Sequence, residues 1–195
     1  MQRTEICDLF AHPKDFSDIQ LTLAGWLRTL RHSKSIGFLE LSDGSCFDTL
    51  QVVCNENTLP DFKKLMKLGS GSAIIVRGTL TLTPDARQPF ELQATKIEIE
   101  GTSPSDYPLQ KKHHSLEYLR EIAHLRPRTN TLSAVFRIRS AAAFAIHHFF
   151  HDRGFYYIHT PIITSSDAEG AGEMFRLTTL DFSDPPHTKN GAVDF

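Results

Sequence analysis

The sequence predicts a small barrel of five β-strands followed by an α+β region. Three observations predict this fold class. Residues 19–100 alternate apolar and polar side chains with the period of two that is typical of strands, a single short helical pattern interrupts them, and a long helical pattern begins only after residue 130. With 195 residues, 40% of them hydrophobic, the chain can bury a core.

Three strand patterns come first, and each has one apolar face. Because strand side chains alternate between the two faces of a sheet, Phe38 and Glu40 in the second strand and Gln51 in the third point away from that face. We therefore expect Phe38 and Gln51 to be exposed on one face of the sheet. The apolar face comprises Ile19, Leu21, Leu23, Leu39, Leu41, Leu50, Val52 and Cys54.

A short amphipathic helix and two more strands complete the barrel. Residues 59–68 have helical spacing and end at Gly69, and strands follow at 73–82 and 90–100. The apolar positions change parity within the last strand, which predicts a bulge near Thr95 and Lys96. Three strands, a helix and two strands is the order of a Greek-key barrel of the oligonucleotide-binding (OB) type, although any five-stranded barrel would share the pattern.

A linker with a change of charge follows the barrel. Pro104 and Pro108 mark it by composition. The formal charge of the whole chain is -2, yet residues 107–139 carry seven Lys and Arg against two Glu, a local balance of +5. This stretch can attract a phosphate backbone. A solvated hinge whose arginines pair with carboxylates elsewhere is an equal alternative.

The last region begins with a helix expected from about Leu132 to Asp152, stopped by Gly154. A strand is predicted directly after it, at 155–164, with Pro161 inside. Proline is tolerated only at an edge or a bulge, because it cannot donate to the ladder. An apolar edge strand of this kind favours pairing with another subunit, and a capped edge of a monomer is the alternative.

Composition excludes several classes of protein. Cys7, Cys46 and Cys54 are too few and too irregularly spaced for a zinc site or a disulfide framework, so we expect reduced thiols. No apolar run reaches membrane-spanning length, and the first residues lack the pattern of a leader. A soluble cytoplasmic protein without a protein-bound metal is expected.

These residues carry a resemblance to a known family. The run FAIHHFFHDRGFYYIHTPIIT resembles the first signature motif of class II aminoacyl-tRNA synthetases, and GWLRTLRHSKSIGFLELSDGSCFDTLQVV resembles the anticodon-binding barrel of their aspartyl, asparaginyl and lysyl subgroup. HLRPRTNT and TPIITSSDAEGAGEMF resemble asparaginyl-tRNA synthetases in particular. The resemblance, over residues 3–195, implies an OB-fold anticodon-binding domain at 1–102, a hinge at 103–130 and, at 131–195, the incomplete start of an antiparallel-sheet catalytic domain.

The resemblance also implies functional residues. Phe38 would stack on an anticodon base, Gln51 would hydrogen-bond a neighbouring base edge, and Arg31 would contact the anticodon loop. Stacking platforms for splayed bases need such an outward face. The alternatives are an aromatic side chain covered by the linker for Phe38 and ordinary solvated residues for Gln51 and Arg31.

In the second region, the resemblance places Pro161 in a homodimer interface formed by the helix and strand, and Glu169 against the ammonium group of the bound amino acid. A carboxylate beside a cationic substrate gains a charge-assisted hydrogen bond. The alternative for Glu169 is a cap on a turn. Glu173 has no assigned role.

The implied activity is the ATP- and Mg²⁺-dependent joining of asparagine to tRNA(Asn). The second and third signature motifs, which bind ATP, are expected downstream of residue 195, so we expect no catalytic residue within the chain and no activity from it alone. Two alternatives stay open: an aspartyl enzyme that also charges the asparagine tRNA, and a stand-alone OB-fold module that binds tRNA.

Overall fold

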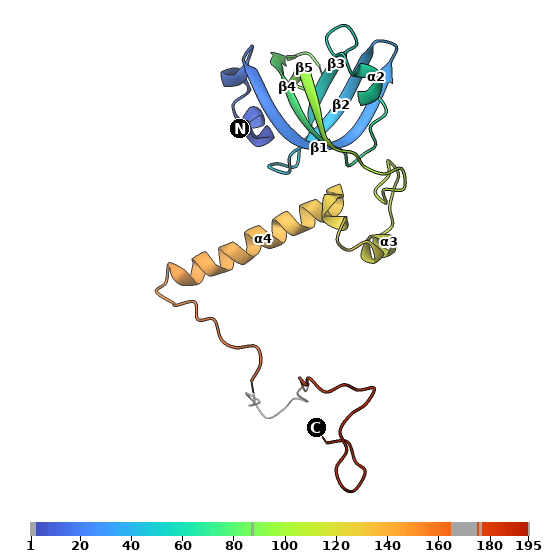
Figure 1. Cartoon of the computed structure of the whole chain (residues 1–195). Helices are drawn as coiled ribbons and strands as arrows, with labels where there is room; N and C mark the ends of the chain where they lie inside the picture. The colour runs from blue at the N-terminus through green and yellow to red at the C-terminus, as the bar shows by residue number, and fades with distance from the viewer. Residues whose placement is uncertain (1–2, 87, 165–174, 176, 195) are drawn as a thin grey trace. The chain divides into compact units, whose positions relative to one another are not determined.

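Five strands form a closed barrel in the computed structural model, which describes residues 3–86, 88–164, 175 and 177–194 (Figure 1). Contacts divide the chain into two units, Met1–Ala145 and Ile146–Phe195. The strands are β1 (Gln20–Ser33), β2 (Ile36–Ser42), β3 (Leu50–Asn55), β4 (Ala73–Leu82) and β5 (Phe90–Gly101). The helices are α1 (Ile6–Ala11), η1 (Pro13–Phe16), α2 (Phe62–Leu65), α3 (Leu116–Glu121), η2 (Arg126–Arg128) and α4 (Asn130–His151).

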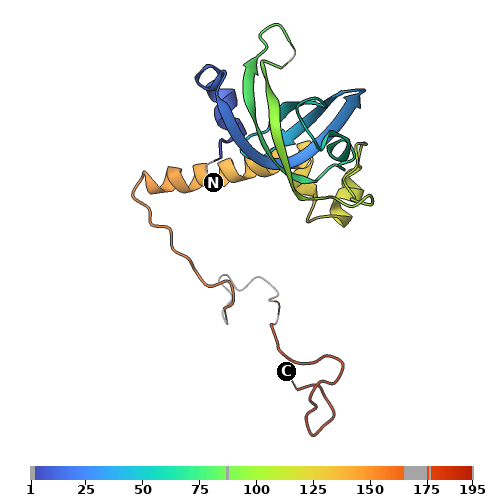
Figure 2. The same ribbon diagram turned by 45° about the horizontal axis from the view of Figure 1, so that its top comes forward.

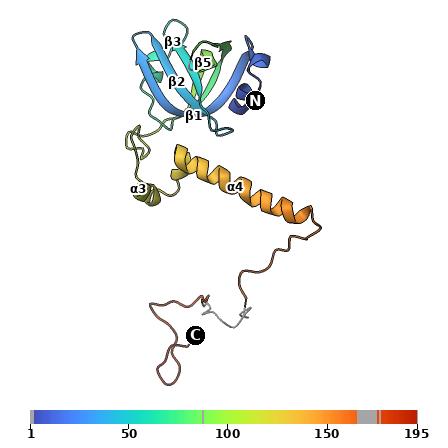
Figure 3. The same cartoon turned by 180° about the vertical axis from the view of Figure 1, so that it is seen from behind.

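The barrel closes because β1 pairs on both sides. The strand order is β1-β2-β3-β5-β4, and the 14 residues of β1 pair with β4 in their first half and with β2 in their second. All pairs are antiparallel except β3 with β5. Figure 3 shows β1 and β2 from behind, and Figure 2 shows the connection between β4 and β5 projecting at the top. A closed barrel leaves no unpaired edge, so its backbone donors and acceptors are satisfied within the sheet.

The predicted apolar face forms the core of this barrel, with one exception. Leu23, Leu39 and Val52 are fully buried, whereas Ile19 is 48% exposed and lies just outside β1. Asp18 has a φ of 60°, so the chain turns immediately before the strand and the alternation does not extend back to Ile19. The prediction for Ile19 was therefore wrong.

The predicted bulge in β5 is confirmed. Arg77 pairs with Lys96 and Gly78 pairs with Ala94, so Thr95 is passed over in the ladder. A Cβ atom at Gly78 would lie 2.3 Å from the carbonyl oxygen of Gln93. Glycine is therefore required where the two strands approach each other at the bulge.

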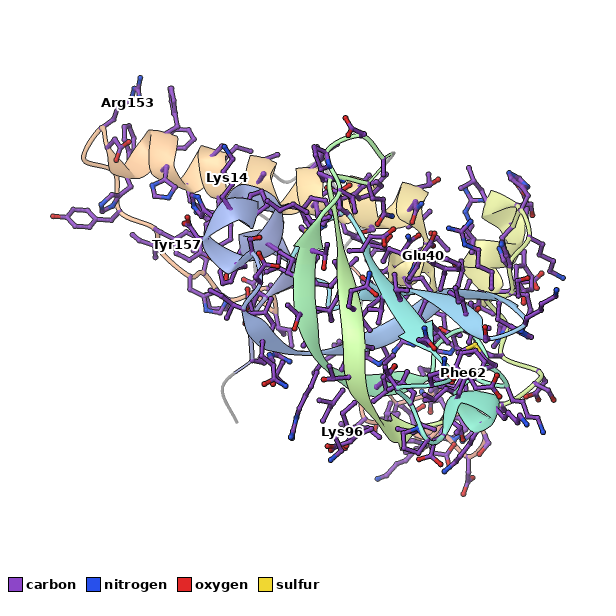
Figure 4. All side chains as sticks on the ribbon, turned by 90° about the horizontal axis from the view of Figure 1, so that it is seen from above. Lys14, Glu40, Phe62, Lys96, Arg153 and Tyr157 are labelled. Atoms are coloured by element: carbon purple, nitrogen blue, oxygen red, sulfur yellow. The ribbon has the colours of Figure 1, made fainter. Side chains whose placement is uncertain are left out.

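The predicted helix at 59–68 is shorter than expected. Leu59, Phe62 and Leu65 are buried as predicted, but α2 spans only Phe62–Leu65. Pro60 disfavours the helical conformation for the residue before it, which accounts for the late start. Figure 4 labels Phe62 on this helix.

The second unit begins within α4 and contains a clear disagreement with the sequence prediction. The helix ends at His151, and Gly154 adopts a φ of 82°, as a helix-stopping glycine should. Residues 155–164, predicted as a strand, form no strand in the structure. A strand requires a partner for its backbone groups, and no described strand pairs with this segment.

Candidate nucleic-acid interface

A row of side chains crosses the outer surface of the barrel. Arg31 on β1 lies opposite Phe38 on β2, and Phe38 lies opposite Val53 on β3. One step along the strands, Gln51 lies opposite Glu40, which Figure 4 labels on β2. The inward neighbours Leu39 and Val52 are buried, so the parity that fills the core also places this row outside.

Three of these residues form a chain of contacts that continues to Glu91 on β5, and we call the four the outer polar row: Phe38, Arg31, Gln51 and Glu91. The Arg31 guanidinium carbon lies 5.1 Å from the centre of the Phe38 ring. Arg31 Nη2 donates a hydrogen bond to Gln51 Oε1 at 3.0 Å, and Gln51 Nε2 donates to Glu91 Oε1 at 2.5 Å. The structure thus brings together the three residues predicted for the anticodon loop.

The burial of Gln51 corrects one expectation. Its side chain was expected to be exposed, but Gln51 is only 9% exposed, whereas Phe38 is half-buried and Arg31 is exposed. Gln51 does face outward. Arg31 on β1, two strands away, and Glu91 on the adjacent β5 hydrogen-bond its amide, and their side chains shield it from solvent.

These two neighbours also fix the orientation of the Gln51 amide. An arginine side chain has only donors, and an ionised glutamate side chain has only acceptors. The amide oxygen must therefore face Arg31, and the amide nitrogen must face Glu91. One N–H and one lone pair of the amide remain for another ligand, and their directions are set by the protein before that ligand arrives.

The chemistry of the row suits unpaired bases. An aromatic ring and a guanidinium plane are the two surfaces on which proteins stack bases, and an amide can hydrogen-bond a base edge. The row crosses β1, β2, β3 and β5. It therefore includes the β2 and β3 face, the part of an OB barrel that commonly binds oligonucleotides. The outer polar row therefore has the features of a single-strand nucleic-acid interface.

Glu91 is a member of the row that the sequence analysis did not single out. The alternation of Phe90 and Leu92 in the sequence does place Glu91 on the outer face. Its position beside Gln51 depends on the parallel pairing of Val52 with Leu92, which joins segments 40 residues apart. No local pattern in the sequence reveals that pairing.

Two other basic residues on the barrel surface share one carboxylate. Lys96 Nζ lies 2.7 Å from Glu98 Oε1, and Arg77 Nη2 lies 3.5 Å from the same atom; Lys96 is labelled in Figure 4. The hydrogen bond from Lys96, followed by the charges of Lys96 and Arg77, holds the pKa of Glu98 below its usual value. Glu98 offsets one of the two positive charges, so this pair attracts an anion less than two free cations would.

For the residues predicted in the second unit, the structure shows less of a binding site than it does for the outer polar row. Pro161 lies in an extended segment whose apolar neighbours Ile158 and Ile162 are 73% and 94% exposed. Glu169 and Glu173 lie outside the described residues. Within the described ranges, no cluster of His, Cys, Asp and Glu has the arrangement of a metal site, and no helix combines the length and apolar character needed to cross a membrane.

Comparison with known families supports both halves of the chain. Residues 21–100 match the family model described as OB-fold nucleic acid binding domain, and residues 115–184 match the model described as tRNA synthetases class II (D, K and N). Among curated proteins, the asparagine–tRNA ligases of Acetivibrio thermocellus and Clostridium tetani are 62% and 56% identical over all 195 residues. The chain spans 42% of the length of each of these relatives.

Solved structures show the same fold. The asparaginyl-tRNA synthetase of Pyrococcus horikoshii complexed with asparaginyl-adenylate matches 94% of this chain and 41% of its own, with a TM-score of 0.80 at 24% identity. An aspartyl-tRNA synthetase from Entamoeba histolytica matches 83% of this chain and 39% of its own, with a TM-score of 0.69 at 20% identity. The chain therefore shares its fold with these enzymes.

Proposed function

Because the chain belongs to the class II tRNA synthetases of the D, K and N group, we propose that it is part of an asparagine–tRNA ligase in which the barrel binds the anticodon loop. The identity of 53–62% to asparagine–tRNA ligases over the whole chain supports asparagine over aspartate as the amino acid. The observation that carries the binding role is the outer polar row, since it presents a stacking ring, a guanidinium and an oriented amide on one face.

Each member of the row has a distinct role in this proposal. Phe38 stacks one base of the loop, and Arg31 contacts the neighbouring nucleotide. Gln51 hydrogen-bonds a base edge with the N–H and lone pair that Arg31 and Glu91 leave free. Because both neighbours hold the amide in place, little rotamer entropy is lost when the base binds.

The activity of the whole protein is a two-step ligation. The carboxylate of asparagine attacks the α-phosphorus of ATP, which yields asparaginyl-adenylate and pyrophosphate, and a terminal ribose hydroxyl of tRNA(Asn) then displaces AMP. Class II synthetases use ATP and Mg²⁺, and Mg²⁺ neutralises phosphate charge. Among the residues that the structure describes, none are grouped so as to hold a metal ion. Glu169 is proposed to bind the ammonium group of asparagine.

A homodimer in the cytoplasm is the assembly we propose. Support comes from the exposed apolar side chains around Pro161, including Phe155 at 61% and Ile163 at 69% exposed. Apolar groups in this number are usually covered by protein. Figure 4 labels Arg153 and Tyr157 at the start of this region. Sedimentation equilibrium of the full-length protein should give a dimer, and a strictly monomeric protein would contradict this assembly.

The binding role is tested with a fluorescently labelled stem-loop RNA that carries the asparagine anticodon, and with a matched RNA whose loop is scrambled. Replacement of Phe38 by Ala should weaken binding of the anticodon loop by about 1–3 kcal/mol, because one stacked base is lost. Tyr156→Ala is the control, since Tyr156 is an aromatic residue 92% exposed in the second unit. Equal affinity of Phe38→Ala and the wild type would refute the role of the row.

The division of labour is tested by pyrophosphate exchange. The 195-residue chain with asparagine, ATP and Mg²⁺ should show no exchange, because the ATP-binding motifs are expected in other parts of the protein. Robust exchange by this chain would overturn the proposal. The full-length protein is the positive control, and it should exchange pyrophosphate with asparagine and not with aspartate.

A further inference from the structure

A second cluster of cations lies near the outer polar row, where η2 and α4 contact β1 and the loop after β2. Arg28 is at the bulge in β1, Arg128 is the last residue of η2, and Arg137 is on α4. All three belong to the first unit and line one cavity of about 270 Å³. We call them the arginine cluster.

Backbone and amide groups hold the three guanidinium groups in place. Arg28 donates to the carbonyl oxygen of Arg128 and, at 3.1 Å, to Asn130 Oδ1. Arg137 Nη2 donates to the carbonyl oxygens of Gly44 at 2.7 Å and Cys46 at 3.0 Å. Arg128 Nη1 donates to the Tyr107 hydroxyl at 3.0 Å. The guanidinium groups are therefore oriented before any ligand binds.

None of these partners neutralises the charge. Carbonyl, amide and hydroxyl oxygens accept hydrogen bonds but carry no formal charge. Among the described residues, no carboxylate lies within ion-pair distance of Arg28, Arg128 or Arg137, unlike Arg77, which is paired with Glu98. A guanidinium has five N–H donors, and each member of the cluster uses only one or two hydrogen-bonding nitrogens here. Free donors and a net positive charge remain.

Two aromatic side chains border the same cavity. Trp26 is 46% exposed and Phe47 is 51% exposed, and the Arg128 guanidinium lies 5.9 Å from the Trp26 ring. Cations interleaved with exposed aromatic rings are typical of surfaces that follow a nucleic-acid strand, where phosphates contact the cations and bases or sugars contact the rings.

The cluster is also continuous with the outer polar row. Arg28 and Arg31 are three residues apart on β1, a separation of about 10 Å at the usual rise of a strand. Trp26 pairs with Ser42 and Arg31 pairs with Phe38, so both lie along the β1-β2 ladder. An RNA strand with a base on Phe38 can therefore pass along this ladder to the cluster.

We propose that Arg28, Arg128 and Arg137 form a binding site for the phosphodiester backbone of the RNA whose loop bases contact the outer polar row. The proposal rests on the proposed function, because it assigns the same partner to a second site. Contacts to phosphates fix position and carry no sequence information, whereas contacts to base edges carry it. The cluster therefore contributes affinity and salt dependence, and the outer polar row contributes selectivity.

A competing explanation is that the guanidinium groups serve only to fasten the start of α4 and η2 to the barrel. The two explanations differ in their response to lysine. Lysine keeps the charge but lacks the planar fork of arginine. A phosphate site therefore retains most of its salt dependence in an Arg→Lys variant, whereas a purely structural fastening is lost with lysine as it is with glutamine.

The test measures binding of the labelled anticodon stem-loop and the scrambled-loop RNA to this chain over a range of salt concentrations. Arg28→Gln and Arg137→Gln should each weaken binding of both RNAs by roughly tenfold, and the slope of log K against log salt should become shallower by about 0.7–1. Arg28→Lys and Arg137→Lys should keep the wild-type slope. Arg120→Gln is the matched control and should leave affinity and slope nearly unchanged, since Arg120 pairs with Glu117, a carboxylate that no other described cation shares.

Two results would overturn the proposal: unchanged slopes in both glutamine variants, or lysine variants that lose as much affinity as the glutamine variants. If a glutamine variant has a lower melting temperature than the wild type by circular dichroism, the affinity and salt slope of the lysine variant at that position decide between a phosphate site and a structural role. Failure of the proposed function looks different. The wild type would then bind the anticodon loop and the scrambled loop equally, while the effect of the arginines on the slope can be read with either RNA.

Discussion

The barrel and the segment after α4 contain similar apolar residues. They differ in whether a partner strand is present to pair with their backbone. In the barrel, Ile74 is 1% exposed within a strand that pairs on both sides. In the second unit, Ile162 is 94% exposed, and the predicted strand around it does not form. A β-branched apolar residue favours strand structure only where a partner strand and a buried face are present. The difference shows that closure, more than local propensity, stabilises strands in this chain.

The largest expected contrast between the two regions is in hydrogen exchange of the backbone amides. Amides in β3 and β5 should exchange only through global unfolding, which for a domain of this size costs about 5–15 kcal/mol. Amides at 156–163 donate no hydrogen bond to a described residue and should exchange at nearly the rate of a free peptide. Mass-spectrometric exchange of the 195-residue chain checks this, and strong protection at 156–163 would break the comparison.

Core truncation should sharpen the contrast. Leu39 is fully buried between neighbouring strands, so Leu39→Ala should lower the free energy of unfolding of the barrel by about 2–5 kcal/mol through lost burial and a residual cavity. Ile162→Ala is the matched control in the second unit and should change it by less than about 0.5 kcal/mol. Urea titration followed by tryptophan fluorescence measures both, and similar losses would show that residue 162 is packed in solution.

The glycine at the bulge gives a smaller effect of steric origin. Gly78→Ala would place a methyl group 2.3 Å from the Gln93 carbonyl oxygen, so strands β4 and β5 must separate, at a cost of about 1–3 kcal/mol. Gly101→Ala, at the end of the same strand pair, meets no atom within 4 Å and should be nearly neutral. Thermal melts of the two variants should differ accordingly, and equal melting temperatures would contradict the close approach.

Burial of Cys54 predicts a pH dependence confined to the barrel. Burial raises the pKa of the Cys54 thiol from 9.0 to about 12. Because the folded state holds this proton more tightly than the unfolded state, the contribution of Cys54 is complete below pH 9 and is lost as the pH rises toward 12. The loss approaches about 1.4 kcal/mol per pH unit.

The variant Cys54→Ala isolates this effect. The difference in unfolding free energy between the wild type and the variant should shrink as the pH rises above 9, because only the wild type carries the thiol. A difference that stays constant between pH 8 and pH 11 would show that burial does not raise the pKa of Cys54 in the folded state. Urea titrations at each pH provide the measurement.

The sequence predicted most of the barrel and part of the candidate site. Alternation alone placed Leu39 and Val52 inside, Phe38 and Gln51 outside, and a bulge at Thr95. Alternation failed at Ile19, because the chain turns at Asp18. The helical pattern failed at residues 59–61, because Pro60 delays the start of α2 until Phe62. These failures occur at ends of elements, where local backbone geometry outweighs periodicity.

Two features depended on pairing between distant segments. The parallel contact of β3 with β5 places Glu91 beside Gln51, and the contact of α4 with the loop after β2 places Arg137 beside Gly44. Both join residues at least 40 positions apart. No local pattern reports such contacts.

The sequence by itself determined which side chains face the core and which face outward, because strand alternation is a property of the local backbone. It also carried the motifs that match an OB-fold nucleic acid binding domain over residues 21–100 and the class II tRNA synthetases (D, K and N) over residues 115–184, which can be read without coordinates. Only the tertiary structure decided that Gln51 is held between Arg31 and Glu91, that the arginine cluster has no carboxylate partner among the described residues, and that residues 155–164 do not form a strand. The physical reason is that burial, charge pairing and strand formation depend on partners that local sequence does not specify.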